Sequence, residues 1–190
     1  MERTSTDSNA PATDAQASPP RVCVIVSRYN DSITGPMREA AQASYHARYA
    51  DREGAFLGLV EAPGAFELTA LATAAIESGM YDGIVTLGCV IRGETDHDRY
   101  ISAAVASGLT TLTVQTGVPV AFGVITANTI EQARARSGGD KGNKGAEAMD
   151  ALLDALDGIR HLYGAAADGV PAGYTINHTP TDKAAPTPAS

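Results

Sequence analysis

Short, uninterrupted apolar segments recur along this 190-residue chain, and they constrain its fold more than any other feature. The first is Val22–Val26, and the later ones are Ala55–Val60, Gly83–Ile91 and Val120–Thr126. A continuous apolar run rich in β-branched residues is typical of a strand that is buried on both faces. Such strands occur in parallel sheets covered by helices on either side. The four segments therefore predict one parallel sheet.

A segment with helical character follows each predicted strand. We expect these helices at Ile33 to about Tyr49, Phe66–Glu77, Asp96 or His97 to about Thr116, and Thr129 to about Arg136; after a loop at Ser137–Gly142, a last helix begins at Asn143 and ends between Leu156 and Leu162. This alternation favours an α/β fold, a three-layer flavodoxin-like sandwich with a four-stranded parallel sheet and helices on both faces. Ligands of such sheets bind at the carboxyl ends of the strands.

Polar segments without hydrophobic periodicity flank the predicted domain. Residues 1–20 are rich in Ser, Thr, Ala and Pro, and residues 163–190 are rich in Pro, Ala and Thr. Such segments bury too little apolar surface to offset the entropy lost on ordering. We therefore expect a folded domain at residues 21–162, with a disordered segment before it and a disordered tail after it.

Composition and charge exclude several classes of protein. No basic and then apolar stretch resembles a signal peptide, and no apolar run is long enough to span a bilayer. The formal net charge of −8, without a basic stripe, argues against a nucleic-acid partner. Cys23 and Cys89 lie in apolar segments and are interpreted as buried, reduced thiols. We expect a cytoplasmic protein that binds neither membranes nor nucleic acid.

The turn that follows the third predicted strand carries the first candidate chemistry. Gly93 permits close backbone approach, and Thr95 and Asp96 are good residues for the start of a helix. The free N–H groups of a helix start form an anion site of phosphate size. His97 would lie one turn away, where an imidazole can transfer protons near neutral pH. The alternative is a capping turn followed by a surface histidine.

Arg136 and Lys144 are candidate phosphate ligands near the end of the domain. Arginine binds phosphate in a bidentate manner, although Arg136 would also stabilise the end of its own helix through the helix dipole. The glycine-rich segment between them fails the Walker pattern, because Asn143 and Gly145 replace the residues that this pattern requires. It also follows a helix instead of a strand, so a nucleoside triphosphatase is excluded.

Aromatic residues are scarce in this chain, so those near strand ends are candidate binding residues. Tyr29 and Phe66 follow two strands and Phe122 lies early in a third, where a ring could stack on a planar heterocycle. Ordinary core packing is the alternative for Phe66 and Phe122. Glu67 could accept hydrogen bonds from a polyol or simply complement a helix dipole. The scattered histidines and two separated cysteines predict no metal site.

Five segments together resemble the lumazine synthase family, in the family's order and at about its spacing. They are Ser27–Asn30, Ala62–Leu68, Gly88–His97, Pro119–Thr126, and Glu131–Ala133 continuing to Gly142–Gly145. The resemblance covers roughly residues 21–156, and its most specific element is Ile91-Arg92-Gly93-x-Thr95-x-His97. It implies condensation of 5-amino-6-(D-ribitylamino)uracil with 3,4-dihydroxy-2-butanone 4-phosphate to 6,7-dimethyl-8-ribityllumazine, without a cofactor. The protein would position two small substrates and transfer protons.

The resemblance also assigns roles to individual residues. His97 matches the proton-transfer histidine, and Tyr29 matches the aromatic residue that stacks on the pyrimidine. The remaining binding residues are Ala65, Phe66 and Glu67 for the ribityl chain and ring, Cys89, Val90 and Ile91 for the pyrimidine edge, Glu94, Thr95 and Arg136 for phosphate, and Phe122 and Lys144 lining the site. In the family, the counterparts of Phe122 and Arg136 come from the neighbouring subunit.

Assembly and one departure from the family bear on function. The resemblance implies a homopentamer, and the short Ser137–Gly142 loop favours a 60-subunit icosahedral shell; riboflavin synthase is a candidate partner. Asp98 and Arg99 replace the aromatic and acidic residues that usually follow the histidine. This departure keeps open a second hypothesis, a binding or shell protein with weak catalysis. A flavodoxin-like receiver or flavin carrier is disfavoured, because the first strand lacks their phosphate loop and acidic cluster.

Overall fold

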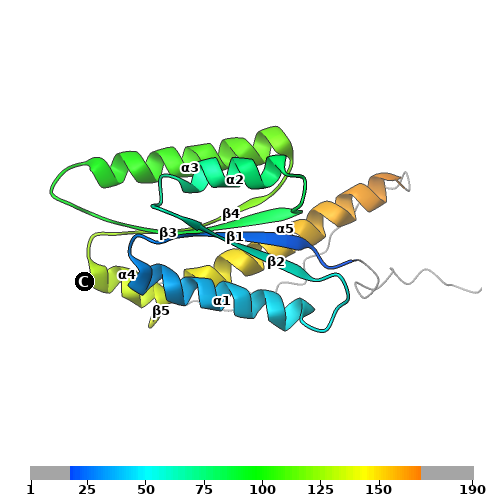
Figure 1. Cartoon of the computed structure of the whole chain (residues 1–190), viewed down its shortest axis with the longest axis horizontal. Coiled ribbons are helices and arrows are strands. Elements are labelled where there is room, and N and C mark those ends of the chain that lie inside the picture. Colours follow the sequence, from blue (N-terminus) through cyan, green and yellow to red (C-terminus); the bar gives the residue numbers. More distant parts are fainter. Residues whose placement is uncertain (1–17, 168–190) are drawn as a thin grey trace, which may run out of the picture. The chain divides into compact units, whose positions relative to one another are not determined.

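Four strands alternate with helices in the computed structural model, which describes residues 18–167 (Figure 1). The elements are β1 Arg21–Ser27, α1 Asp31–Tyr49, β2 Phe56–Ala62, α2 Leu68–Glu77, β3 Gly83–Ile91, α3 His97–Thr116, β4 Val120–Ala127, α4 Ile130–Arg136, β5 Ser137–Gly139, β6 Gly142–Asn143 and α5 Lys144–Ala167. The chain divides after Asp157 into two units, and the core and the site described below belong to the first.

The four long strands form one parallel sheet in the order β2-β1-β3-β4. The central strands β1 and β3 are buried along almost their whole length, whereas the edge strands β2 and β4 are partly exposed. Burial on both faces is the reason that the central strands read as unbroken apolar runs. The predicted three-layer flavodoxin-like α/β fold is confirmed.

Successive residues of β1 enter two different hydrophobic cores, because side chains alternate between the faces of a strand. Val24 and Val26 pack in a core with side chains of α1 and α5. Cys23 and Ile25 pack in a second core with side chains of α2 and α3. Figure 1 accordingly shows α2 and α3 on one face of the sheet and α1 on the other. The sheet is thus held from both sides, which fixes its carboxyl-terminal rim.

The N-terminal limit of ordered packing lies slightly before the predicted start of the domain. Pro19 and Pro20 are buried, and the hydroxyl group of Tyr45 donates a hydrogen bond to the carbonyl oxygen of Pro20 at 2.7 Å. The same hydroxyl oxygen accepts a hydrogen bond from the backbone N–H of Phe56 at 2.9 Å. Residues 1–17, most of the predicted N-terminal segment, lie outside the described residues.

The C-terminal part of the domain differs from expectation in two places. Residues of the expected loop pair as an antiparallel hairpin, β5–β6, with Ser137 opposite Asn143. Helix α5 continues to Ala167, so residues 163–167 are helical although they were assigned to the tail. Apolar residues on one face of α5 carry its pattern, but the alanine-rich end has no periodic signal to mark where it stops. Residues 168–190 lie outside the described residues.

Candidate active site

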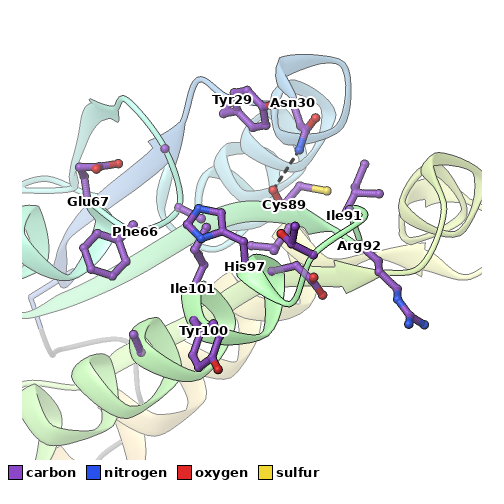
Figure 2. Close-up of a pocket in the computed structure, with 17 residues that line it drawn as sticks. Tyr29, Asn30, Phe66, Glu67, Cys89, Ile91, Arg92, His97, Tyr100 and Ile101 are labelled. Carbon is purple, nitrogen blue, oxygen red and sulfur yellow. Dashed lines mark hydrogen bonds between the residues drawn. The ribbon is translucent and has the colours of Figure 1, made fainter.

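A pocket of about 910 Å³ opens at the carboxyl-terminal rim of the sheet (Figure 2). Its walls come from the turn after β1, the turn after β2, the end of β3 and the first turns of α3. Nine residues predicted from the sequence line it: Tyr29, Ala65, Phe66, Glu67, Cys89, Val90, Ile91, Thr95 and His97. Parallel strands bring their carboxyl ends to one edge, which explains why segments distant in sequence meet here.

Tyr29 lies in the turn after β1, and hydrogen bonds hold the backbone of this turn in place. Among the described residues, Asn30 is the one non-glycine residue with positive φ (64°), a conformation that asparagine tolerates better than most residues. Its side-chain amide donates to the carbonyl oxygen of Cys89 at 3.0 Å and so ties the turn to β3. Thr34 donates to the carbonyl oxygen of Ser27 at 2.8 Å. These bonds hold the backbone while the Tyr29 ring stays 71% exposed.

The turn after β2 places an aromatic ring and a carboxylate on the opposite wall. Ala65 is buried and Leu68 is fully buried at the start of α2, so the turn is anchored on both sides of Phe66. Phe66 itself is 60% exposed, which rules out the core packing considered above. Helix α2 begins two residues later than predicted, and Phe66 and Glu67 therefore lie in the turn. Both side chains line the pocket.

The end of β3 supplies the floor of the pocket. Cys89 and Val90 are almost completely buried, and Ile91 is partly exposed. Burial raises the pKa of the Cys89 thiol to about 11, so the thiol is neutral near pH 7. Beyond the strand, the backbone N–H of Arg92 donates to the carbonyl oxygen of Ala127 at 2.8 Å. The floor is thus apolar apart from backbone groups at the strand end.

Helix α3 carries His97 at its first position, on the wall next to Phe66. Figure 2 shows the His97 and Phe66 rings pointing towards the same space. Tyr100, Ile101 and Ala104 line the pocket at three, four and seven residues beyond His97, the spacing of one helix face. The helix-start residue is Asp96, whose side chain makes no capping hydrogen bond. The first N–H groups of α3 therefore keep the anion-binding capacity that helix starts possess.

Asp98 and Arg99 take different directions from the start of α3. Asp98 is partly buried and lines the pocket, whereas Arg99 forms a long, exposed ion pair with Asp96 at 3.9 Å. Within the described chain, no hydrogen bond joins Asp98 to His97. The lining of the pocket thus includes two carboxylates of this chain, those of Glu67 and Asp98, as well as the His97 imidazole.

A comparison with known protein families shows which family this chain belongs to. A family model described as 6,7-dimethyl-8-ribityllumazine synthase matches residues 19–160. The protein belongs to this family. Membership confirms the resemblance and indicates a lumazine synthase of riboflavin biosynthesis, an enzyme of the transferase class. Within residues 18–167, no helix has the length and apolar character of a membrane span, and no cluster of three metal-binding side chains occurs.

Four residues that the lumazine synthase resemblance placed at the site lie outside this pocket. Glu94 is exposed on the turn before α3, and Phe122 projects from the edge strand β4 into a separate surface groove beside α3. Arg136, at the end of α4, donates from its guanidinium to the carbonyl oxygen of Gln132 at 3.0 Å. Lys144 forms an ion pair with Glu147 at the start of α5. One chain alone does not bring these four residues to the pocket.

Eight pocket residues of this lumazine synthase family member were not assigned a binding or catalytic role from the sequence. They are Asn30, Gly64, Arg92, Gly93, Asp98, Tyr100, Ile101 and Ala104. A sequence signal existed for the last three, because they follow His97 at helical spacing on the helix that was predicted. Arg92 contributes near the rim, but its guanidinium points away from His97 in Figure 2. No local pattern identifies Asn30, whose bond to Cys89 spans 59 residues of sequence.

Proposed function

We propose that this protein condenses 5-amino-6-(D-ribitylamino)uracil with 3,4-dihydroxy-2-butanone 4-phosphate to give 6,7-dimethyl-8-ribityllumazine. The observation that carries the proposal is the single pocket in which three exposed aromatic rings, two carboxylates and an imidazole surround an apolar floor. Large apolar pockets with a few convergent polar groups are the usual form of a small-molecule site. Membership of the lumazine synthase family supports the particular pair of substrates.

The pyrimidine would lie on the wall formed by Tyr29. An exposed tyrosine ring on an anchored turn provides a flat surface for stacking on a heterocycle. Backbone groups at Val90 and Ile91, where β3 ends, are available to bind the pyrimidine edge. The ribityl chain would extend past Ala65 and Phe66, with a hydroxyl group donating to the Glu67 carboxylate.

The sugar phosphate would bind at the start of α3. Backbone N–H groups there and the Thr95 hydroxyl suit a phosphate group through the helix dipole. Glu94, on the same turn, would contribute its backbone only, because its carboxylate would repel the anion. The substrate amine attacks the ketone carbon, and an imine forms with loss of water. Phosphate then leaves, and ring closure releases a second water. His97, the first residue of α3, would transfer protons in these steps, so the catalytic group acts beside both substrates.

The remaining ligands would come from a neighbouring subunit. Phe122 and Arg136 lie on the outer surface of the chain and outside its own pocket, as a shared site requires. Lys144 lies close in sequence to Arg136, across the β5–β6 hairpin. We propose a homopentamer with active sites between subunits, and a 60-subunit shell built from it. Riboflavin synthase, which would consume the product, is the candidate partner.

The direct test mixes the purified protein with both substrates and follows lumazine absorbance and fluorescence. General acid–base catalysis by one group contributes about 10²–10⁴-fold, so His97→Ala is expected to reduce the rate within that range. His46→Ala is the matched control, because His46 lies on α1 outside the pocket. If the assembled wild-type protein forms no product above the uncatalysed rate but binds the pyrimidine, the enzyme proposal fails and the binding or shell protein remains.

A further inference from the structure

The side chain of Asn143 makes three hydrogen bonds, one of which reaches a segment that is distant in sequence. Its side-chain amide donates to the carbonyl oxygen of Ser137 at 3.1 Å and to that of Pro36 at 3.1 Å. Its side-chain oxygen accepts the backbone N–H of Gly145 at 2.8 Å. One side chain therefore joins three segments: the β5 strand, helix α1 and the start of α5.

The two ends of the β5–β6 hairpin adjoin the two candidate phosphate ligands, Arg136 and Lys144, which lie outside the pocket of their own chain. Arg136 immediately precedes Ser137, and Lys144 immediately follows Asn143. The pairing of Ser137 with Asn143 thus fixes the backbone next to both cations. At the hairpin tip, the side chains of Asp140 and Lys141 are exposed and form a long ion pair with each other at 3.8 Å. The backbone N–H of Lys141 donates to the carbonyl oxygen of Ala135 at 2.9 Å.

Helix α1 supplies the rigid base for this hairpin. The bond from Asn143 to Pro36 spans 107 residues of sequence, and the adjacent Gly145 packs directly on the backbone of Met37. A side chain at Gly145 would overlap the Met37 carbonyl group, so no larger residue permits this approach. Gly145 and Met37 are both buried. The start of α5 is consequently held against α1 by close packing as well as by the Asn143 amide.

We propose that Asn143 is a positioning residue for anion binding, which sets Arg136 and Lys144 in the orientation that the phosphate of the substrate requires. The inference rests on the proposed function. Long cationic side chains lose much rotamer freedom when they bind, and a fixed backbone at their base reduces what must be ordered. The side chain of Asn143 supplies that fixed backbone for both cations without itself contacting the substrate.

The test replaces Asn143 by serine and measures the KM for each of the two substrates separately. Serine retains a hydroxyl that can accept the Gly145 N–H in the local turn, but it is too short to reach Pro36, and it adds no charge. We expect the KM for the sugar phosphate and the inhibition constant of inorganic phosphate to rise together, by about tenfold, the factor for one weakened charge-assisted contact. The KM for the pyrimidine is expected to stay within about twofold of the wild-type value, which is much less than the change expected from losing one such contact.

Asp140→Ser provides the matched control on the same hairpin, and it should leave both KM values unchanged. A merely structural role for Asn143 would lower the active fraction and thus the apparent kcat, with both KM values preserved; that result would overturn the proposal. If the Asn143→Ser variant does not assemble, hydrogen exchange of the wild-type protein tests the proposal instead. Inorganic phosphate should slow exchange at residues 136–144, and no slowing there contradicts the inference. Wild-type protein that forms no product would instead reject the proposed function.

Discussion

The two cysteines show how a single residue type can be excluded from the chemistry of a pocket. Cys89 lines the pocket, but its thiol is 2% exposed and burial raises its pKa to about 11. Burial has the same effect on Cys23, whose pKa is also raised to about 11 although a hydrogen bond with Tyr81 opposes the shift. Because the thiolate is the nucleophile, neither residue is suited to covalent catalysis near neutral pH.

Both thiols are therefore expected to resist an aromatic disulfide reagent at pH 8. A thiol with a pKa of about 11 is ionised in only about one molecule in a thousand at that pH, and burial further blocks access. Protein unfolded in urea should react rapidly at both cysteines, which serves as the control. Rapid reaction of Cys89 in the folded assembly would show that the pocket floor opens and that its thiol is accessible.

His97 and Phe66 contrast with the cysteines, because their side chains are exposed and therefore accessible to a ligand. Phe66 lies between the buried Ala65 and the fully buried Leu68, and His97 is the first residue of α3, where its neighbours are largely exposed. Both side chains line the pocket, and the exposed rings remain available to a ligand. Sequence reasoning identified both residues through the family resemblance, because a histidine at a helix start and an isolated phenylalanine have ordinary structural explanations.

At the scale of elements, Tyr45 connects helix α1 to the starts of two neighbouring strands. Its buried hydroxyl group donates to Pro20 and accepts from Phe56, with distances of 2.7 and 2.9 Å. Tyr45→Phe removes both bonds and leaves two backbone groups without their partner. We expect a loss of about 1–3 kcal/mol in the free energy of unfolding.

Urea unfolding at a fixed protein concentration measures this loss, because association contributes to apparent stability. Tyr100→Phe is the control: its ring is 74% exposed, so removal of its hydroxyl should change stability by no more than about 0.5 kcal/mol. An unchanged midpoint for Tyr45→Phe would mean that water replaces both bonds and that the hydroxyl does not hold α1 to the sheet.

At the scale of the whole molecule, the separation of the site into two groups of residues predicts complementation between subunits. His97 lines the pocket, whereas Arg136 lies on α4 outside it. If each site takes His97 from one subunit and Arg136 from another, His97→Ala and Arg136→Ala subunits should restore activity when mixed. Random mixing in equal amounts restores about one quarter of the sites in a ring.

The measurement dissociates the two inactive variants, reassembles them together, and compares activity with each variant reassembled alone. Sedimentation of the same samples reports whether the particle is a pentamer or a larger shell. Exchange of subunits without recovery of activity would show that His97 and Arg136 do not act in one shared site, and it would remove the main argument for catalysis between subunits.

The sequence by itself determined the four strands of the main sheet, the helices and their order. Val22–Val26 and Gly83–Ile91 were predicted because a strand buried on both faces needs apolar residues at every position, a rule that acts locally. The helical pattern predicts a helix from Asp96 or His97 to about Thr116, and α3 spans His97–Thr116. Family resemblance added most of the pocket residues, and the structure brings nine of them together.

Only the tertiary structure decided which distant residues hold the site in place. Asn30 binds Cys89 across 59 residues and Asn143 binds Pro36 across 107, and no local pattern encodes either pairing. The sequence predicts a loop where the β5–β6 hairpin forms, for the same reason: pairing of such a glycine-rich segment depends on the α4 and α1 surfaces beside it. Local periodicity specifies elements, whereas hydrogen bonds between segments form only after those elements have packed.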